Sequence, residues 1–366
     1  MGELCLAEVD SRSPRAGELW RALERRARPP YFLSFAFVES WLGALPERLR
    51  PPLFALSRDG ELAALFFLGA RRVVRHRVLP SRARYLNTTG DERFDELTLE
   101  HNALLSEPGT PIGLSEWLEL LPGTWDELFL PALASDGFPG RALGEPIADG
   151  RVLIERQVDS PYVDLARVRA EEGGYLSLLG ANTRAQIRRA ERGYGELALE
   201  VAGSTGQAAD IFAELVEMHE RHWRGREQPG AFSDPWILQF HRQLIEQRLP
   251  HGEIQLIRVR SKLATIGCLY NFVWQGRVLF YQSGFASFED PRLKPGYVCH
   301  ALAVEHNALL GHSLYDFLGG DARYKQNLGT GKTSLLWARV QRPLVRFTLE
   351  RRLRDIRSAL RSHPSG

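Results

Sequence analysis

The chain contains little cysteine, little lysine and no long apolar segment, and each of these shortages argues against a class of protein. Its 366 residues include three cysteines, Cys5, Cys268 and Cys299, which share no metal-type spacing and cannot all pair. We therefore expect neither a disulfide-rich secreted domain nor a zinc site, and we expect a cytoplasmic setting. No apolar run approaches the roughly 18–20 residues of a membrane span, and the N-terminus lacks the apolar core of a secretory signal.

Positive charge is scarce in the first part of the chain and more abundant in the second. Residues 1–165 hold 19 basic residues, all Arg, against 25 acidic ones, a net charge of −6. Residues 166–366 hold 28 basic against 20 acidic residues, a net charge of +8. The second part is better suited to hold an anion, but its excess is too small for a DNA-binding protein. The only four lysines all lie there: Lys262, Lys294, Lys325 and Lys332.

The composition, 44% apolar and 25% charged residues, predicts a globular protein, and the length predicts two domains or one large one. In the first part, we expect helices at 18–28, 34–45 and 114–121, a hairpin turning at Asp59-Gly60, and a strand that ends near 165. The segment 101–150 is expected to form loops and cover rather than a site. We place the domain boundary at residue 165.

The second part alternates apolar strand patterns with helical ones. The expected order is helix 182–192, strand 196–201, helices 207–224 and 235–248 (the latter capped by Ser233), strands 254–260, 264–274 and 277–285, helix 297–310, strand 313–318, a short helix to 328, and strand 335–340. A meander followed by a crossover helix and another strand is typical of a mixed α/β sheet. We assign 166–342 to this second domain and 343–366 to a basic C-terminal helix and tail.

Two motifs resemble known sites but lack essential parts. The run GTGKT at 329–333 has Gln326 where a phosphate-binding P-loop needs its first glycine. His219 and His222 are three residues apart, whereas a zinc-protease helix has its histidines four apart. We therefore predict no metal and no nucleotide hydrolysis.

One strand–loop–helix segment has the features of an anion-binding site. An apolar strand ends in Ser283-Gly284-Phe285, and a loop then delivers Lys294, Pro295 and Gly296 to the start of a helix. The N-terminus of a helix offers unpaired N–H groups and a partial positive charge, and Lys294 adds a full one. The pattern favours a pyrophosphate site near Gly296 and Tyr297, although an ordinary helix start has the same signature.

A second cluster of polar residues follows the strand 313–318. Asp316 lies within this strand, and after two glycines Asp321, Tyr324 and Lys325 are spaced to share one face of a helical turn. Titratable groups just beyond the end of a strand often form a site. The alternative is a structural helix cap with an Asp321–Lys325 pair.

A third group is basic and aromatic. Arg184, Arg188 and Arg192 repeat every four residues on one predicted helical face, which would meet an anion or simply face solvent. His222 and Trp223 end the helix 207–224 before a Gly/Pro loop, a place suited to line an acceptor site.

At these residues the sequence resembles a known family. The segments NTRAQIRRAER, HERHWRGREQPGAFSDP and RVLFYQSGFASFEDPRLKPGYVCHALAVEHNALLGHSLYDFLGGDARYK are similar to the GNAT-fold acyltransferases of the cellulose-biosynthesis-associated (CelD/BcsL) branch, related to Fem-type peptidyltransferases. The resemblance is close over about 180–337 and looser over 15–165. It implies two tandem GNAT-like domains, the first degenerate. One departure is that RLKPGYV has a single glycine where typical members have a richer acyl-CoA loop.

The resemblance implies an N-acyltransferase, in the first instance an acetyltransferase, that moves an acyl group from acyl-CoA to an amine on a sugar or cell-envelope polysaccharide precursor. It implies that Ser283, Gly284 and Phe285 hold the thioester carbonyl, with Lys294, Gly296 and Tyr297 at the pyrophosphate. Tyr324 takes the place of the general acid. Asp316 and Asp321 are candidate bases, with His222 as a third and Lys325 as a neighbour of the site.

Two other functions remain open. One is a Fem-type aminoacyltransferase that uses aminoacyl-tRNA as its donor. The other is a non-catalytic assembly protein of a polysaccharide system, for which the C-terminal helix 344–360 would contact a partner or the inner face of the membrane through its arginines. The sequence identifies neither the acyl group nor the acceptor, and it does not determine the oligomeric state.

Overall fold

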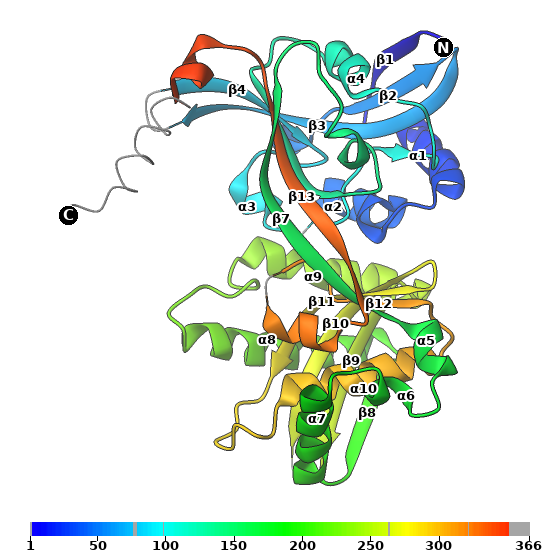
Figure 1. Ribbon diagram of the computed structural model, residues 1–366, viewed down its shortest axis with the longest axis vertical. Coiled ribbons are helices and arrows are strands. Elements are labelled where there is room, and N and C mark those ends of the chain that lie inside the picture. Colours follow the sequence, from blue (N-terminus) through cyan, green and yellow to red (C-terminus); the bar gives the residue numbers. More distant parts are fainter. Residues whose placement is uncertain (1, 76–78, 98, 263, 321, 351–366) are drawn as a thin grey trace, which may run out of the picture. The chain divides into compact units, whose positions relative to one another are not determined.

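The computed structural model describes residues 2–75, 79–97, 99–262, 264–320 and 322–350, which form two compact units (Figure 1). The first unit comprises Met1–Phe35, Leu45–Gln157 and Leu335–Gly366, and the second comprises Ala36–Ala44 and Val158–Ser334. Within the described residues, no helix combines the length and the apolar character that crossing a membrane requires. Asp321 and most of the predicted C-terminal helix, from 351 on, lie outside the described residues, whereas 345–350 are helical.

The first unit is built on a mixed sheet. Its strands, in spatial order, are β1 (Leu4–Val9), β2 (Leu53–Arg58), β3 (Glu61–Arg75), β4 (Leu79–Leu86), β6 (Glu127–Ala134) and β13 (Gly331–Gln341), with β5 (Leu105–Ser106) beside β3. Its helices are α1 (Pro14–Ala27), α3 (Glu92–Asp95) and α4 (Leu114–Leu120). The hairpin turn is confirmed at Asp59-Gly60, where both residues have positive φ, as a two-residue turn requires.

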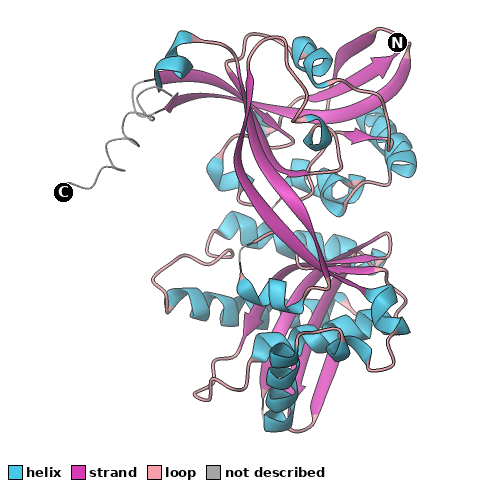
Figure 2. Ribbon diagram, in the orientation of Figure 1, coloured by secondary structure: helices cyan, strands magenta, loops and turns pink. Residues whose placement is uncertain are grey.

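The second unit has a sheet of the same kind, covered by helices on both faces (Figure 2). Its strands, in spatial order, are β8 (Leu197–Val201), β9 (Ile254–Ser261), β10 (Thr265–Trp274), β11 (Arg277–Phe285), β12 (Leu314–Asp316) and β7 (Arg151–Asp164). Its helices are α2 (Phe35–Ala44), α5 (Leu165–Ala170), α6 (Gly174–Ser177), α7 (Ala181–Tyr194), α8 (Thr205–Arg224), α9 (Pro235–Arg248), α10 (Pro295–Leu309) and α11 (Arg323–Leu328). Short 3-10 helices lie at Tyr31–Leu33, Glu47–Leu49, Gly140–Ala142 and Leu249–His251.

Neighbouring residues of β10 show which helices cover each face. Tyr270 points toward α8 and α9, where its ring meets Phe212 and His241. Leu269 points to the opposite face and belongs to the apolar core that includes Val298 and Cys299 of α10. This alternation is the period of two that a buried strand requires.

The two units share one pairing pattern. In each, three antiparallel pairings are followed by one parallel and one antiparallel pairing: β4 is parallel to β6, and β11 is parallel to β12. The last strand of each sheet comes from the other part of the chain. In the first unit β6 pairs with β13, which lies late in the sequence, and in the second unit β12 pairs with β7, which lies early. This exchange makes both units discontinuous, whereas the division predicted from sequence cuts the chain once after 165 and once after 342.

Three details differ from the sequence-based expectations. The cap of α9 is Asp234, whose carboxylate accepts the N–H of Trp236, while the Ser233 hydroxyl donates to Gly230. The segment 101–150, expected as loops and cover, contains β6, which pairs on both sides, with β4 and with β13. Strand β12 is shorter than 313–318, because Leu318 adopts a positive φ of 58° and leaves the ladder.

Candidate functional site

Strands β11 and β12 run side by side for three residue pairs and then part. Their parallel pairing extends from Arg277↔Leu314 to Leu279↔Asp316, whereas β11 continues to Phe285 in pairing with β10. From residue 280 on, the side of β11 that faced β12 has no ladder partner among the described strands. We call this side of residues 280–285 the open edge of β11.

The hydrogen-bond register shows which residues turn their peptide groups toward the open edge. The N–H of Ala286 donates to β10 at 3.0 Å, and hydrogen-bonded pairs alternate along an antiparallel ladder. Gly284 therefore bonds to β10, whereas Ser283 and Phe285 direct N–H and C=O to the open edge. In agreement, the carbonyl of Ser283 lies 3.0 Å from Nδ1 of His219 instead of bonding in the ladder. The open edge thus presents two outward N–H groups, roughly 6–7 Å apart along the strand, and either one of them can hold a carbonyl oxygen.

The two glycines predicted to bind the donor both lie in close packing contacts. A Cβ on Gly284 would overlap the Leu215 carbonyl of α8, so this glycine lets the helix cross close to β11. A Cβ on Gly296 would lie 3.2 Å from the ring of Phe285, so that side of Gly296 faces the ring rather than an open surface. The structure thus places both glycines beside the open edge, with a packing role for each.

The start of α10 is less open to an anion than its sequence indicates. Lys294 is exposed and precedes the helix with a φ of 41°. Pro295 has no N–H, and the N–H groups of Tyr297 and Val298 both donate to the carbonyl of Lys294, at 3.0 and 3.3 Å. The hydroxyl of Tyr297 accepts from the Asn327 amide at 2.9 Å, which joins α10 to α11. Lys294 is therefore the main attraction for an anion here.

The turn after β12 is held by Asp316 and Lys325. The Asp316 side chain is 1% exposed and accepts from the Ser160 hydroxyl at 3.0 Å and from the N–H of Leu318 at 2.8 Å. Arg277 lies 3.5 Å from its second oxygen. The Lys325 ammonium donates to two carbonyls of the same turn, at 2.7 and 3.3 Å. Both charges are thus bound to the turn where β12 leaves β11.

Tyr324 lies on α11 and is mostly buried. Its ring is stacked on that of His300, with centroids 5.7 Å apart and an angle of 18° between the planes. Burial raises the pKa of the Tyr324 hydroxyl well above its usual value of 10, so the group keeps its proton. Burial also lowers the pKa of His300 to about 3, with Lys325 adding to the effect, so the imidazole under Tyr324 is neutral.

Two histidines of α8 have different surroundings. His222 is exposed and contacts Trp223, and partial desolvation together with the nearby charge of Arg226 lowers its pKa. His219 is buried, and its Nε2 accepts the N–H of Ala231 at 3.2 Å. Its proton is therefore on Nδ1 and is donated to the carbonyl of Ser283. His219 matched no metal motif in the sequence and was given no role there. In the structure it joins the α8–α9 loop to the open edge.

The arginines of α7 form an exposed basic surface near the loop that precedes α10. Arg188, Arg189 and Arg192 are exposed, whereas Arg184 donates to the carbonyl of Ser177. The end of α7 contacts the loop through Tyr194, whose ring lies 5.4 Å from that of Phe288. A phosphate held near Lys294 would thus lie beside this surface.

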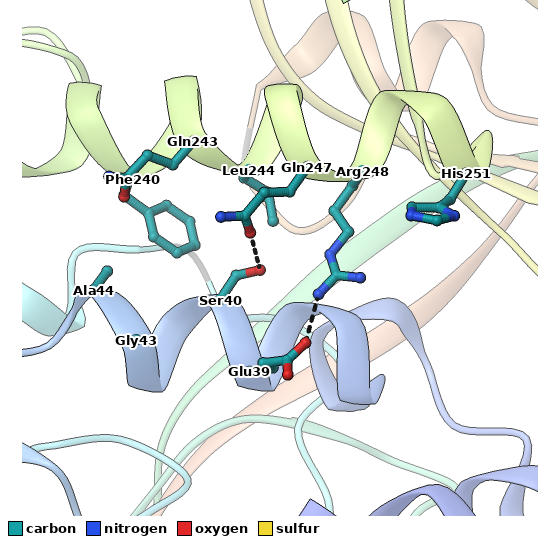
Figure 3. A pocket seen from close by; sticks show the side chains of 10 residues that line it. All are labelled: Glu39, Ser40, Gly43, Ala44, Phe240, Gln243, Leu244, Gln247, Arg248 and His251. Atoms are coloured by element: carbon teal, nitrogen blue, oxygen red, sulfur yellow. Dashed lines mark hydrogen bonds and ion pairs between the residues drawn. The ribbon is translucent and has the colours of Figure 1, made fainter.

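One pocket of the second unit lies elsewhere, between α2 and α9 (Figure 3). It has a volume of about 620 Å³. It is crossed by an ion pair between Arg248 and Glu39 at 3.0 Å and by a contact between Ser40 and Gln247 at 3.4 Å. It contains none of the predicted site residues. Among the described residues, no group of three or more His, Cys, Asp or Glu could hold a metal ion.

Comparisons with known proteins concern the type of domain. Residues 181–326 match the family model described as "Acetyltransferase (GNAT) domain", so this part of the chain is similar to GNAT-type acyltransferase domains. A search of curated protein sequences finds no match.

Several solved structures are similar over almost the whole chain. The crystal structure of FemX has a TM-score of 0.54 at 10% identity and covers 92% of this chain and 96% of its own. A conserved protein of unknown function from Bacteroides thetaiotaomicron has a TM-score of 0.51 at 11% identity, with 93% and 100% covered. A tandem GNAT protein of the clavulanic acid pathway has a TM-score of 0.49 at 13% identity, with 93% and 98% covered. The predicted mixed α/β fold with tandem GNAT-like units is confirmed.

Proposed function

We propose that the protein is an N-acyltransferase that moves an acyl group, in the first instance acetyl, from acyl-CoA to an amine on a sugar or cell-envelope precursor. The observation that carries the proposal is the parting of β11 and β12 next to Tyr324. It supplies a strand edge with outward N–H groups beside a protonated phenol, which are the two elements that thioester aminolysis needs. Assignment to the cellulose-biosynthesis-associated branch is part of this proposal.

The residues of the second unit have separate roles in this reaction. The N–H of Ser283 or of Phe285 holds the thioester oxygen, on which negative charge develops as the amine attacks. A C–N bond forms, the C–S bond breaks, and Tyr324 donates its proton to the departing sulfur. Lys294 and the exposed arginines of α7 attract the phosphates of the donor.

The base that accepts the proton of the amine is less defined. Asp316 is committed to Ser160, Leu318 and Arg277, so we assign it to the turn and not to proton transfer. Lys325 has the same positioning role. Asp321 and the exposed His222 remain as candidate bases, either directly or through water.

In the first unit, the place that corresponds to the open edge of β11 is filled by side chains of that unit. Its parallel strands pair up to Tyr85↔Phe129, and beyond this point Asn102, fully buried, donates to the carbonyls of Leu86 and Pro131 at 3.2 and 3.0 Å. The turn after β4 is also occupied, because Asp95 accepts the N–H groups of Thr89 and Gly90 at 2.8 and 2.6 Å. We therefore place the donor in the second unit alone.

The test combines binding and turnover on the full chain. Acetyl-CoA, longer acyl-CoAs and free CoA are screened by thermal shift, and a ligand at 100 times its Kd should add about 2.7 kcal/mol of stability. Release of the CoA thiol is then followed with a panel of amino sugars and other amines. Binding of acyl-CoA with amine-dependent thiol release supports the proposal, and absence of both refutes it.

The use of aminoacyl-tRNA is the alternative, and one observation favours it: the start of α10 offers little more than Lys294 to a pyrophosphate, while α7 exposes three arginines. A gel-shift assay with charged tRNA at several salt concentrations separates the two. Tight, salt-dependent tRNA binding without acyl-CoA binding would favour the alternative. If the protein binds neither donor, the non-catalytic reading is favoured.

A further inference from the structure

A histidine and two tyrosines form a buried hydrogen-bonded group on the α8/α9 side of the second sheet. His241 of α9 has Nε2 at 3.0 Å from the hydroxyl of Tyr281 on β11 and Nδ1 at 3.3 Å from the hydroxyl of Tyr270 on β10. The rings of His241 and Tyr281 also contact each other, with centroids 4.8 Å apart. His241 and Tyr270 lie outside the segments singled out from the sequence, and Tyr281 lies within one of them without a predicted role.

The imidazole of His241 is neutral in this setting. It is fully buried, and burial lowers its pKa to about 3. A neutral imidazole has one donor and one acceptor nitrogen, so one tyrosine hydroxyl donates to it and the other accepts from it. Both hydroxyl groups are therefore held in defined orientations.

The two tyrosines differ in their access to solvent. Tyr270 is fully buried, whereas Tyr281 is only partly buried. Tyr281 also has an unusual place in the sheet, because the register passes from Tyr270↔Gln282 to Asn271↔Phe280 and leaves Tyr281 as the extra residue of a β-bulge. Bulges are common next to active sites, where they redirect a side chain.

The bulge lies where β11 has just parted from β12. The last pair of that ladder is Leu279↔Asp316, and Tyr281 precedes by two residues Ser283, whose N–H faces the open edge. A hydroxyl with a defined orientation, partly accessible and close to the expected position of the thioester, is suited to bind a polar acceptor.

We propose that Tyr281 hydrogen-bonds the amine-bearing acceptor and that His241 is a positioning residue that orients the Tyr281 hydroxyl. This inference rests on the proposed function and adds the contact for the acceptor. Tyr270 holds the other side of His241 and has no contact with substrate.

The experiment compares Tyr281→Phe with Tyr270→Phe in the full chain. Each substitution removes one hydroxyl from the same imidazole and keeps the aromatic ring. Steady-state thiol release is measured with acetyl-CoA and the best amine of the panel, together with the thermal midpoint and the Kd for acetyl-CoA. For Tyr281→Phe we expect kcat/KM for the amine to fall about 5- to 50-fold through a higher acceptor KM, with the donor Kd unchanged. Both variants should have a lower midpoint, because each leaves one nitrogen of the buried His241 without its partner, but Tyr270→Phe should show the smaller kinetic loss.

His241 is tested by two further variants. His241→Phe keeps an aromatic ring in the cluster and should raise the acceptor KM as Tyr281→Phe does, whereas His241→Gln keeps polar atoms and should restore part of the loss. The double variant Tyr281→Phe/His241→Phe should lose little more than either single variant, because both act through one contact.

The outcomes separate this inference from the function on which it rests. If the parent binds no acyl-CoA and releases no thiol with any amine, the proposed function fails and the inference fails with it. If the parent is active and Tyr281→Phe has the parent's acceptor KM, or if Tyr270→Phe raises that KM equally, the inference alone is overturned.

Discussion

Replacing Tyr324 by Phe tests the general-acid role most directly, because the substitution removes one hydroxyl and keeps the ring. The stacking on His300, with centroids 5.7 Å apart, does not depend on the hydroxyl, so the core of the second unit should be preserved. We therefore expect the thermal midpoint and the affinity for acyl-CoA to change little.

The size of the kinetic effect follows from the proton that is lost. General acid catalysis is typically worth roughly 10²–10⁴-fold. A thiolate with a pKa near ~8.5 is a weak base and needs only partial help, so we expect turnover to fall by about 10–1000-fold. Because burial raises the pKa of Tyr324 above its usual value of 10, its phenol stays protonated throughout pH 7 to 9, and the rate should not fall in this range through its ionisation.

The assay is single-turnover acyl transfer with enzyme in excess over acetyl-CoA, at pH 7 to 9, for the parent and the variant. Tyr175→Phe is a matched control, because the Tyr175 hydroxyl donates to the Leu328 carbonyl at the end of the same helix α11. Its loss should cost about 1 kcal/mol of unfolding free energy and leave the single-turnover rate within a few-fold of the parent. Full activity in Tyr324→Phe, or an equal loss of rate in Tyr175→Phe, would refute the general-acid role.

Three further outcomes are expected. Lys294→Glu should weaken acyl-CoA binding roughly fivefold at low salt and less at high salt, because an exposed charge near the phosphates is reversed; equal affinities in isothermal titrations at both salt concentrations would remove Lys294 from the site. Asn102→Ala should lower the unfolding free energy by about 1–3 kcal/mol in denaturant titrations, since the carbonyls of Leu86 and Pro131 lose their hydrogen-bond donor. The affinity for acyl-CoA should stay that of the parent, and a changed affinity would place the acyl-CoA site in the first unit. Burial lowers the pKa of His219 below its unfolded value, so the contribution of His219 to stability should be complete above pH ~6.5 and decline at lower pH. Thermal midpoints measured from pH 8 to 5 should therefore fall more steeply in the parent than in His219→Asn. Parallel curves for the two proteins would contradict this.

The local structure followed largely from local sequence rules. The Asp59-Gly60 turn, the helix α8 and the strands of the 254–285 meander were predicted within a few residues, because turns, caps and apolar periodicity act over short distances. The cap of α9 was assigned one residue too early, since Ser233 and Asp234 are both good caps and only the fold shows which one accepts the N–H of Trp236. Residues 283–285, predicted to end a strand, lie at the end of β11, and the register with β10 decides which of their N–H groups face the open edge.

The sequence by itself determined the elements, the mixed α/β class and the resemblance to acyltransferases, because these depend on residue types and spacing along the chain. Three features were decided by the tertiary structure alone. They are the pairing of β7 and β13 with strands from the other part of the chain, the hydrogen bonds by which Asn102 fills the end of the parallel pair in the first unit, and the hydrogen bond between His241 and Tyr281. These features join residues that are distant in the sequence, such as Asn102 and Pro131, 29 positions apart, and His241 and Tyr281, 40 positions apart, or they depend on a strand register. A one-residue bulge reverses which side chains face a helix, and no local pattern in the sequence records it.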